Sequence, residues 1–407
     1  MLKIAGELLG HIEALWRVQV SELRNRDEYE RYFKVEKPLN EMLIECQLRG
    51  LRVDLHRLEK RIDTLDDSLF LAKRELKTKW NVDDTDDLDH IRSRIGELFL
   101  PEDIDFSSRE SLDSSLKLLG DTHPFLRCLK TFRDSRRDRE ILLRLGAFPA
   151  GRAFPTFECM GTVTGRVTLK DPPIQNLKRT SRDVFLPEEG FQFVYPDYSQ
   201  FEPGIMADDS GDSQLISDYN AGDLYSSLSV ALFGSVRERA AAKILFLSFC
   251  YGMSHSRMAS FAARLSGESL EDCQRAIAEF FGRYTQLDEW QGSIEARLLT
   301  EGRVGSHMGN YRYRDSSGKQ LSPIERRWAA TQRIQGTASL ILKKVMIRIF
   351  RECESIKMLI PMHDAVLCEV PQEVYDDCAK QLERLFIEEF HAECPSVEPR
   401  VTFNAFS

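Results

Sequence analysis

The spacing of apolar residues divides the chain into helical and strand-like stretches. Amphipathic helices are predicted where apolar residues recur every three or four positions, over 1–80, 123–145, 212–300, 323–351 and 374–389. Strands are predicted for shorter apolar runs that end at polar residues, over 191–199, 356–370 and 400–406. This order of helices, strand, helices and further strands predicts an α+β protein with helical insertions.

The stretch IKMLIPMHDAVLCEV, residues 356–370, has two apolar halves that meet at His363 and Asp364. We interpret it as a hairpin with an ionisable carboxylate at its tip. A buried carboxylate is costly unless it is paired or bound to a cation. The alternative is that Asp364 is an ordinary turn residue that supports its own backbone.

A second carboxylate, Asp197, also follows a strand-like run, in FQFVYPDYS. If the two strands lie side by side, both acids reach one edge of a sheet. Paired carboxylates can hold Mg²⁺, which prefers oxygen ligands. Two such ions, roughly 3.5–4 Å apart, promote phosphoryl displacement. The alternative is that each Asp caps a separate turn.

Arg239, Lys243, Leu247 and Tyr251 recur every four residues in a predicted helix and therefore form one stripe. Two cations one turn apart suit the phosphates of a nucleotide, and Lys243 could also donate a proton. Tyr251, followed by Gly252, offers a face on which a base can stack. A solvated basic face that ends in a glycine cap is the alternative.

Two further segments carry polar residues in unusual settings. Gly336 interrupts a good helix pattern, at a cost of about 1 kcal/mol against alanine, which a closely approaching nucleic-acid backbone would justify. Gln335 and Arg327 on the same helix could share a face and contact minor-groove acceptors. A Gly-Arg turn and the extended PPIQN add Arg166, Gln175 and Asn176 as candidate contacts.

The composition of the chain limits the number of domains and the classes of protein to which it can belong. The 407 residues, 42% of them hydrophobic, suffice for two or three domains, and the net charge of -9 argues mildly against a nucleic-acid binder. Local clusters of Arg in 133–144 and of Lys and Arg in 178–182 oppose that argument. The nine cysteines contain no C-x-x-C pair, so we expect reduced thiols in a cytoplasmic protein, without disulfides or zinc. No apolar run has membrane-spanning length, and the N-terminus reads as an amphipathic helix rather than a signal peptide.

Six segments in register resemble the motifs of family A DNA polymerases, the bacterial DNA polymerase I-like enzymes. They are THPFLRCLKTFRDSRRDREILLRL, TGRVTLKDPPIQNL, DYSQFE, RAAAKILFLSFCYG, IQGTA and MHDA. The resemblance covers residues 36–407. It implies a helix-rich right-hand fold with a small antiparallel palm sheet. The implied division is an N-terminal helical extension 1–36, a thumb 37–160, a palm from 161–207 and 326–407, and fingers 208–325.

The resemblance also implies residue roles. Asp197, Asp364 and the Tyr198 carbonyl would bind two Mg²⁺ ions, with Mn²⁺ as a substitute. Lys243 and Arg239 would grip the incoming dNTP, with Lys243 as proton donor to pyrophosphate. Further dNTP contacts are Leu247, Tyr251 at the templating position, Glu202 as the steric gate against a 2′-OH, Gln200 and Tyr225. Primer-template contacts are Arg166, Gln175, Asn176, Arg327, Gln335 and His363.

Several positions depart from the family pattern. Pro203-Gly204 replaces Leu-Arg, Leu247 replaces an aromatic residue, Ala365 replaces a third acid and Thr331 replaces Asn. Only about 35 residues precede the thumb, so we expect no exonuclease domain and no proofreading in this chain. Asp138 and Glu140 form a D-x-E, which we interpret as a solvated helix face.

The resulting hypothesis is a template-directed DNA polymerase that adds dNTPs to a primer 3′-OH by two-metal phosphoryl transfer. A repair, translesion, phage or mobile-element role stays open. We expect a monomer with primer-template DNA and dNTPs as partners, and an exonuclease or processivity factor as a separate partner. The alternatives are an RNA-making relative, which Glu202 argues against, a catalytically silent primer-template-binding protein, and a metal-dependent nuclease.

Overall fold

A five-stranded antiparallel sheet lies at the centre of the computed structural model, which describes residues 2–97, 112–113, 115–117, 120, 123–315 and 318–407. Its strands follow the order β10 (Lys357–Met362), β11 (Ala365–Pro371), β7 (Pro196–Ser199) and β12 (Arg400–Phe403), and β6 (Phe191–Val194) also pairs with β11. The predicted hairpin and both other predicted strand regions are confirmed.

The sheet is buried on both faces because residues of β11 alternate between two cores. Val366, Cys368 and Val370 belong to the core formed with the helices, whereas Leu367 belongs to a second core with Phe406. The helical side is covered by α15 (Pro323–Glu352) and α16 (Tyr375–Glu393). A Ser322–Glu325 capping box and Pro323 in the first turn start α15 where the sequence predicts it.

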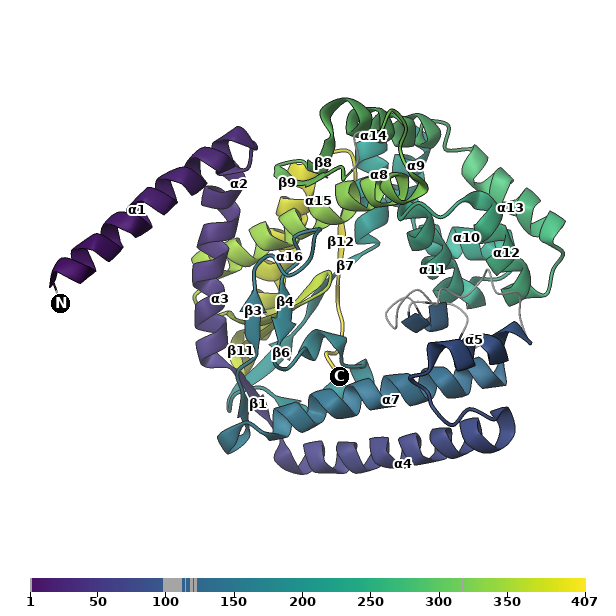
Figure 1. Cartoon of the computed structure of the whole chain (residues 1–407), viewed down its shortest axis with the longest axis horizontal. Helices are drawn as coiled ribbons and strands as arrows, with labels where there is room; N and C mark the ends of the chain where they lie inside the picture. Colours follow the sequence, from purple (N-terminus) through teal and green to yellow (C-terminus); the bar gives the residue numbers. More distant parts are fainter. Residues whose placement is uncertain (1, 98–111, 114, 118–119, 121–122, 316–317) are drawn as a thin grey trace.

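The second core lies between the sheet and a smaller three-stranded sheet of β2 (Arg152–Ala153), β1 (Leu51–Val53) and β5 (Phe185–Leu186). Below it run two long helices side by side, α4 (Leu55–Trp80) and α7 (Pro124–Gly146) (Figure 1). Short elements complete this region: α5 (Leu88–Gly96), β3 (Thr156–Glu158), β4 (Thr168–Lys170), and 3₁₀ turns at Pro149–Gly151, Ile174–Asn176 and Arg179–Val184.

One expectation for α7 was wrong. Asp138 is not on a solvated face: it is 1% exposed, and its carboxylate accepts a 2.7 Å hydrogen bond from Ser181 Oγ and bonds from the Lys178 backbone N–H. Burial raises the pKa of Asp138. The residue therefore anchors the 3₁₀ turn of 179–184 to α7, while Glu140 is exposed.

A helical lobe is inserted between β7 and α15, on the right of Figure 1. Its helices are α8 (Phe201–Ser210), α9 (Ser213–Ala221), α10 (Leu224–Phe233), α11 (Arg239–Cys250), α12 (His255–Ser266), α13 (Leu270–Gly282) and α14 (Leu287–Glu301). The hairpin of β8 (Arg303–Ser306) and β9 (Gly309–Tyr313) leads back to α15. Short 3₁₀ turns at Val236–Glu238 and Gln372–Val374 complete the elements of this half of the chain.

The N-terminal residues form α1 (Leu2–Asn25), α2 (Tyr29–Arg31), a π-helical turn (Tyr32–Glu36) and α3 (Lys37–Arg49). Helix α1 projects away from the rest of the molecule (Figure 1), whereas α3 packs against α15 and β10. All nine cysteines are free thiols. None of the described helices is long and apolar enough to cross a membrane.

Candidate active site

The two predicted carboxylates lie next to each other at one edge of the central sheet. Asp197 on β7 is in register with Ala365 on β11, and the Tyr198 N–H donates to the Asp364 carbonyl at 3.3 Å. Asp364 occupies the two-residue turn between β10 and β11, in which His363 has a left-handed backbone (φ 57°). The fold therefore brings together the ends of two strands that are far apart in sequence.

The carboxylates of Asp197 and Asp364 repel each other. Burial, together with the neighbouring Asp364 charge, raises the pKa of Asp197 to about 6, and Lys243 opposes the shift. Two carboxylates are oxygen donors of the kind that Mg²⁺ prefers. Within the described residues no cluster of three or more His, Cys, Asp or Glu side chains forms a metal site. The donor set therefore suits a cation that completes its shell with water or substrate oxygens.

Glu202, the predicted steric gate, is held between two partners. It lies in the first turn of α8, is 3% exposed, and accepts a 2.6 Å hydrogen bond from Arg166. Its second oxygen accepts a hydrogen bond from the Tyr251 hydroxyl. Burial, with the charge of Asp364, raises the pKa of Glu202 to about 7, although Arg166 opposes the rise.

Arg166 joins this gate to the carboxylate pair. Its Nη2 lies 2.6 Å from Glu202 and 3.6 Å from Asp364 Oδ1. Burial raises the pKa of the Tyr251 hydroxyl, and the Gln335 side chain of α15 acts against that rise. Tyr251, Glu202 and Arg166, from three different segments, thus form one connected polar chain that ends at Asp364.

Helix α11 presents its cations over a buried ring. The Arg239 guanidinium carbon lies 5.3 Å, and Lys243 Nζ 5.9 Å, from the centroid of Tyr225. Both cations are exposed, and Leu247 one turn later is partly exposed. Lys243 also lowers the pKa of Asp197, so the positive charge of Lys243 acts on the carboxylate pair. The predicted stripe of cations therefore borders the site.

The sequence reasoning missed Asp223, which binds the Arg239 guanidinium through both carboxylate oxygens. Asp223 is also the N-cap of α10, where it accepts a hydrogen bond from the Tyr225 N–H. The position of an acid at a predicted helix start is a signal for a cap. The sequence around Asp223 contains no signal for an ion pair with Arg239 on the next helix.

Two predicted contact residues have side chains that brace the fold. The Gln175 amide accepts from the Leu169 N–H at 3.1 Å and donates to the Pro361 carbonyl at 2.8 Å. The Gln200 amide accepts from the Leu224 N–H at 2.8 Å. Asn176 is exposed, and it lines a cavity of about 240 Å³ together with Arg166, Gln175, His363 and Asp364.

A larger cavity, of about 880 Å³, is lined by Tyr251, Gly252 and Arg327 among others. Gly252 has φ +84°, and a Cβ on it would lie 3.1 Å from the Arg327 Cα. The close neighbour of Gly336, for which the sequence suggested a nucleic-acid backbone, is Ser306, which a Cβ added to Gly336 would meet at 3.5 Å. Backbone conformation and packing thus favour glycine at 252, whereas at 336 a Cβ would make only an ordinary van der Waals contact with Ser306.

The Pro203-Gly204 departure has a packing reason. Both residues are buried in α8, and a Cβ on Gly204 would lie 2.7 Å from Tyr219 Cζ and 2.9 Å from Phe390 Cζ. The space beside this turn is thus filled by two aromatic rings and has no room for a larger side chain. Ala365 is 1% exposed and pairs through its backbone with Asp197.

The fold is that of a known class: the chain belongs to DNA polymerase family A, whose model matches residues 55–404. The resemblance noted in the sequence is confirmed. The thermostable DNA polymerase I of Thermus thermophilus is 28% identical over 380 residues, covering 84% of this chain and 44% of that protein. DNA polymerase I of Caldicellulosiruptor bescii is 27% identical over 374 residues, covering 85% and 43%. The chain spans less than half the length of these relatives.

Among solved structures, the chain resembles the POL domain of Pol1 from M. smegmatis in complex with DNA primer-template and dNTP. The TM-score is 0.74 at 24% identity, over 95% of this chain and 72% of that chain. This likeness confirms the predicted helix-rich α+β fold class. Residues 1–54 precede the segment that the family model matches.

Proposed function

We propose that this chain is a template-directed DNA polymerase that adds dNTPs to a primer 3′-OH. The observation that carries the proposal is the side-by-side position of Asp197 and Asp364 on two paired strands. Family membership supports the same activity. Primer-template DNA and dNTP are named for the M. smegmatis domain, and we extend both to this chain as substrates.

The regions of the fold suggest the parts of a polymerase hand. We assign the central sheet with α15 and α16 to the palm, over 161–207 and 326–407. The lobe of 208–325 corresponds to the fingers, and the region 37–160, with the α4–α7 pair, to the thumb. With this assignment α11 faces the palm carboxylates across the site where a dNTP would bind.

The reaction forms a bond from the primer 3′-oxygen to the α-phosphorus of the dNTP and breaks the bond to the bridging oxygen of pyrophosphate. Asp197, Asp364 and the Tyr198 carbonyl are the proposed ligands for Mg²⁺. When bound, the ions would neutralise charge on the phosphates and make the 3′-oxygen a better nucleophile. Lys243 is the proposed proton donor to the pyrophosphate, and Arg239 is the proposed contact of the phosphate tail.

The remaining residues set the geometry of the substrate. Glu202 is locked by Arg166 and Tyr251, so a rigid side chain occupies the place proposed for the 2′ position of the sugar. Arg166, Arg327 and Gln335 are the proposed minor-groove contacts, and His363 at the hairpin tip is the proposed contact of the primer end. Leu247 is the proposed neighbour of the incoming sugar.

Primer extension with each dNTP alone tests the function. Wild-type protein with Mg²⁺ is expected to add only the nucleotide that the template specifies, and Asp364→Ala to add none. Equal extension by both proteins would refute the proposal. Tight primer-template binding without incorporation, under Mg²⁺ or Mn²⁺, would favour the silent binding protein.

The same assay tests the choice of sugar. We expect dNTPs to be preferred over rNTPs, and the preference to fall in Glu202→Ala, which removes the gate. A wild-type preference for rNTPs would support the RNA-making alternative. Extension past an abasic template site, compared with an undamaged template, tests a translesion role.

A further inference from the structure

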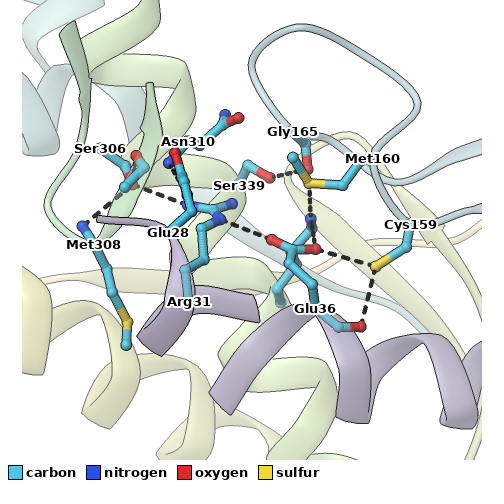
Figure 2. A network of polar contacts seen from close by, with 12 residues as sticks. Glu28, Arg31, Glu36, Cys159, Met160, Gly165, Ser306, Met308, Asn310 and Ser339 are labelled. Atoms are coloured by element: carbon cyan, nitrogen blue, oxygen red, sulfur yellow. Dashed lines mark hydrogen bonds and ion pairs between the residues drawn. The ribbon is translucent and has the colours of Figure 1, made fainter. Parts of the chain in front are cut away.

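The N-terminal segment 28–36 reaches into the interior of the polymerase domain, although it precedes the residues that the family model matches. Figure 2 shows its polar contacts. Arg31 is 1% exposed, and its Nε donates a 2.8 Å hydrogen bond to Glu36. Glu36 in turn accepts a 2.6 Å hydrogen bond from Lys343 of α15, which is also 1% exposed. Three ionisable groups are therefore buried together.

One side of this network holds the β8–β9 hairpin. The Glu28 carboxylate accepts hydrogen bonds from the backbone N–H groups of Asn310 and Tyr311, at 2.9 and 2.8 Å. Arg31 Nη1 donates to Ser306 Oγ at 2.9 Å, and Ser306 Oγ donates to the Gly309 carbonyl at 2.8 Å. The hairpin turn is thus fastened to the N-terminal segment by contacts on both its strands.

The other side of the network contacts the loop that carries Arg166. Cys159 Sγ lies 3.2 Å from Glu36 Oε2, and Met160 Sδ lies 3.1 Å from Lys343 Nζ. Further along the loop, the Gly165 carbonyl accepts a 2.5 Å hydrogen bond from Ser339. The loop is therefore held at both ends by the network and by α15.

Gly165 rests directly on the buried arginine. It has φ +78°, and a Cβ built on it would lie 2.9 Å from Asn310 Nδ2 and 3.2 Å from Arg31 Nη2. Arg31 Nη2 is buried and has no hydrogen-bond partner within the part of the chain that the structure describes. Leaving a buried donor unsatisfied costs about 1–3 kcal/mol. Stability alone does not explain an arginine here, because buried ionic groups can often be replaced by apolar ones without loss.

The residue that follows Gly165 is Arg166, which contacts both Glu202 and Asp364. We propose that Arg31 is a positioning residue: by supporting the Gly165 turn against the β8–β9 hairpin, it keeps Arg166 in contact with the gate and the carboxylate pair. The N-terminal segment then contributes to the geometry of the polymerase site by positioning Arg166. This inference rests on the proposed function.

A double-mutant cycle with Arg166 separates positioning from simple stability. Arg31→Met keeps much of the side-chain volume and removes the donors. It is expected to lower kcat/KM for correct single-nucleotide incorporation about tenfold, within the range for coupled residues. In an Arg166→Ala background the same substitution is expected to change kcat/KM less than about twofold, because no Arg166 is left to position. Any loss in thermal unfolding midpoint should be equal in both backgrounds.

Arg17→Met is the matched control, because Arg17 is exposed on α1 and pairs only with the exposed Glu13 in the described structure. It is expected to leave kcat/KM unchanged. An Arg31→Met effect of equal size in both backgrounds, or no effect on wild-type kcat/KM, would overturn the inference. If Arg31→Met does not fold, Arg31→Lys or Ser306→Ala gives the same cycle with a smaller disturbance. A wild-type protein without any incorporation would instead refute the proposed function.

Discussion

The backbone N–H of Tyr198 donates a hydrogen bond to the carbonyl oxygen of Asp364, at 3.3 Å. Together with the pairing of Asp197 with Ala365, this bond joins β7 to the tip of the β10–β11 hairpin. It places the Asp197 side chain beside Asp364, where burial and the second charge raise the pKa of Asp197 to about 6. The strand pairing thus brings together two acids that repel each other.

Asp197→Asn is expected to abolish primer extension and to raise the thermal unfolding midpoint in metal-free buffer. The amide keeps the shape of the side chain, removes the repulsion with Asp364 and loses the anionic ligand. We expect extension to fall at least about a hundredfold, the scale for losing one electrostatic stabiliser. Gel-based extension and circular dichroism measure the two effects. Asp63→Asn, an exposed change on α4, is the control for both. A lowered midpoint would contradict the repulsion.

Asp223→Asn is expected to lower the KM for dNTP roughly two- to fivefold, the range for breaking an exposed ion pair. Asp223 binds Arg239, and this carboxylate competes with the phosphates for the guanidinium. Asparagine still caps α10, so the fold is expected to be retained. Steady-state single-nucleotide kinetics measure KM. Asp272→Asn, in the exposed Asp272–Arg275 pair of α13, should leave KM unchanged. A raised KM would show that Asp223 instead aligns Arg239.

Stability is expected to fall as pH rises from about 6.5 to 9, because of His307. Its ring lies 3.2 Å from Asp209 and 3.5 Å from Glu393. The hydrogen bond with Asp209, then that with Glu393, raises the pKa of His307 to about 9. The folded state thus binds this proton more tightly than the unfolded state. The stabilisation is complete below the unfolded pKa of about 6.5 and is lost through pH 9, on the order of 3 kcal/mol in total.

Urea unfolding at a series of pH values measures this slope in the free energy of unfolding. In His307→Gln the slope between pH 6.5 and 9 is expected to flatten. His56, an exposed histidine on α4, serves as the control, and His56→Gln should keep the wild-type slope. An unchanged slope in His307→Gln would show that the Asp209–His307–Glu393 cluster does not carry the effect.

Gly204→Ala is expected to destabilise the protein by about 1–3 kcal/mol through overpacking, despite the better helix propensity of alanine. The added Cβ would meet Tyr219 Cζ at 2.7 Å and Phe390 Cζ at 2.9 Å. The matched control is Gly292→Ala in α14, where the Cβ meets nothing within 4 Å. That change is expected to stabilise by roughly 0.5–1 kcal/mol. Chemical unfolding measures both, and equal signs would refute the packing argument.

Much of the architecture was open to prediction from local patterns. The two apolar halves of 356–370, the helical periodicity of 323–351 and the polar end of 191–199 predicted elements that the structure confirms. Such patterns work because a helix or strand depends on residues two to four positions apart. The six motifs in register likewise identified the family, since their residue types and order are carried by the sequence itself.

The tertiary structure decided which of these residues meet. The burial of Asp138 contradicted its solvated appearance, because a neighbouring turn packs its backbone on that carboxylate. The contact of Asp223 with Arg239 and the position of Arg31 beneath Gly165 were likewise not predicted from the local sequence. These contacts join segments that are distant in the chain. A charged residue has the same local pattern whether water or another element covers it, so only the packing of whole elements determines its partner.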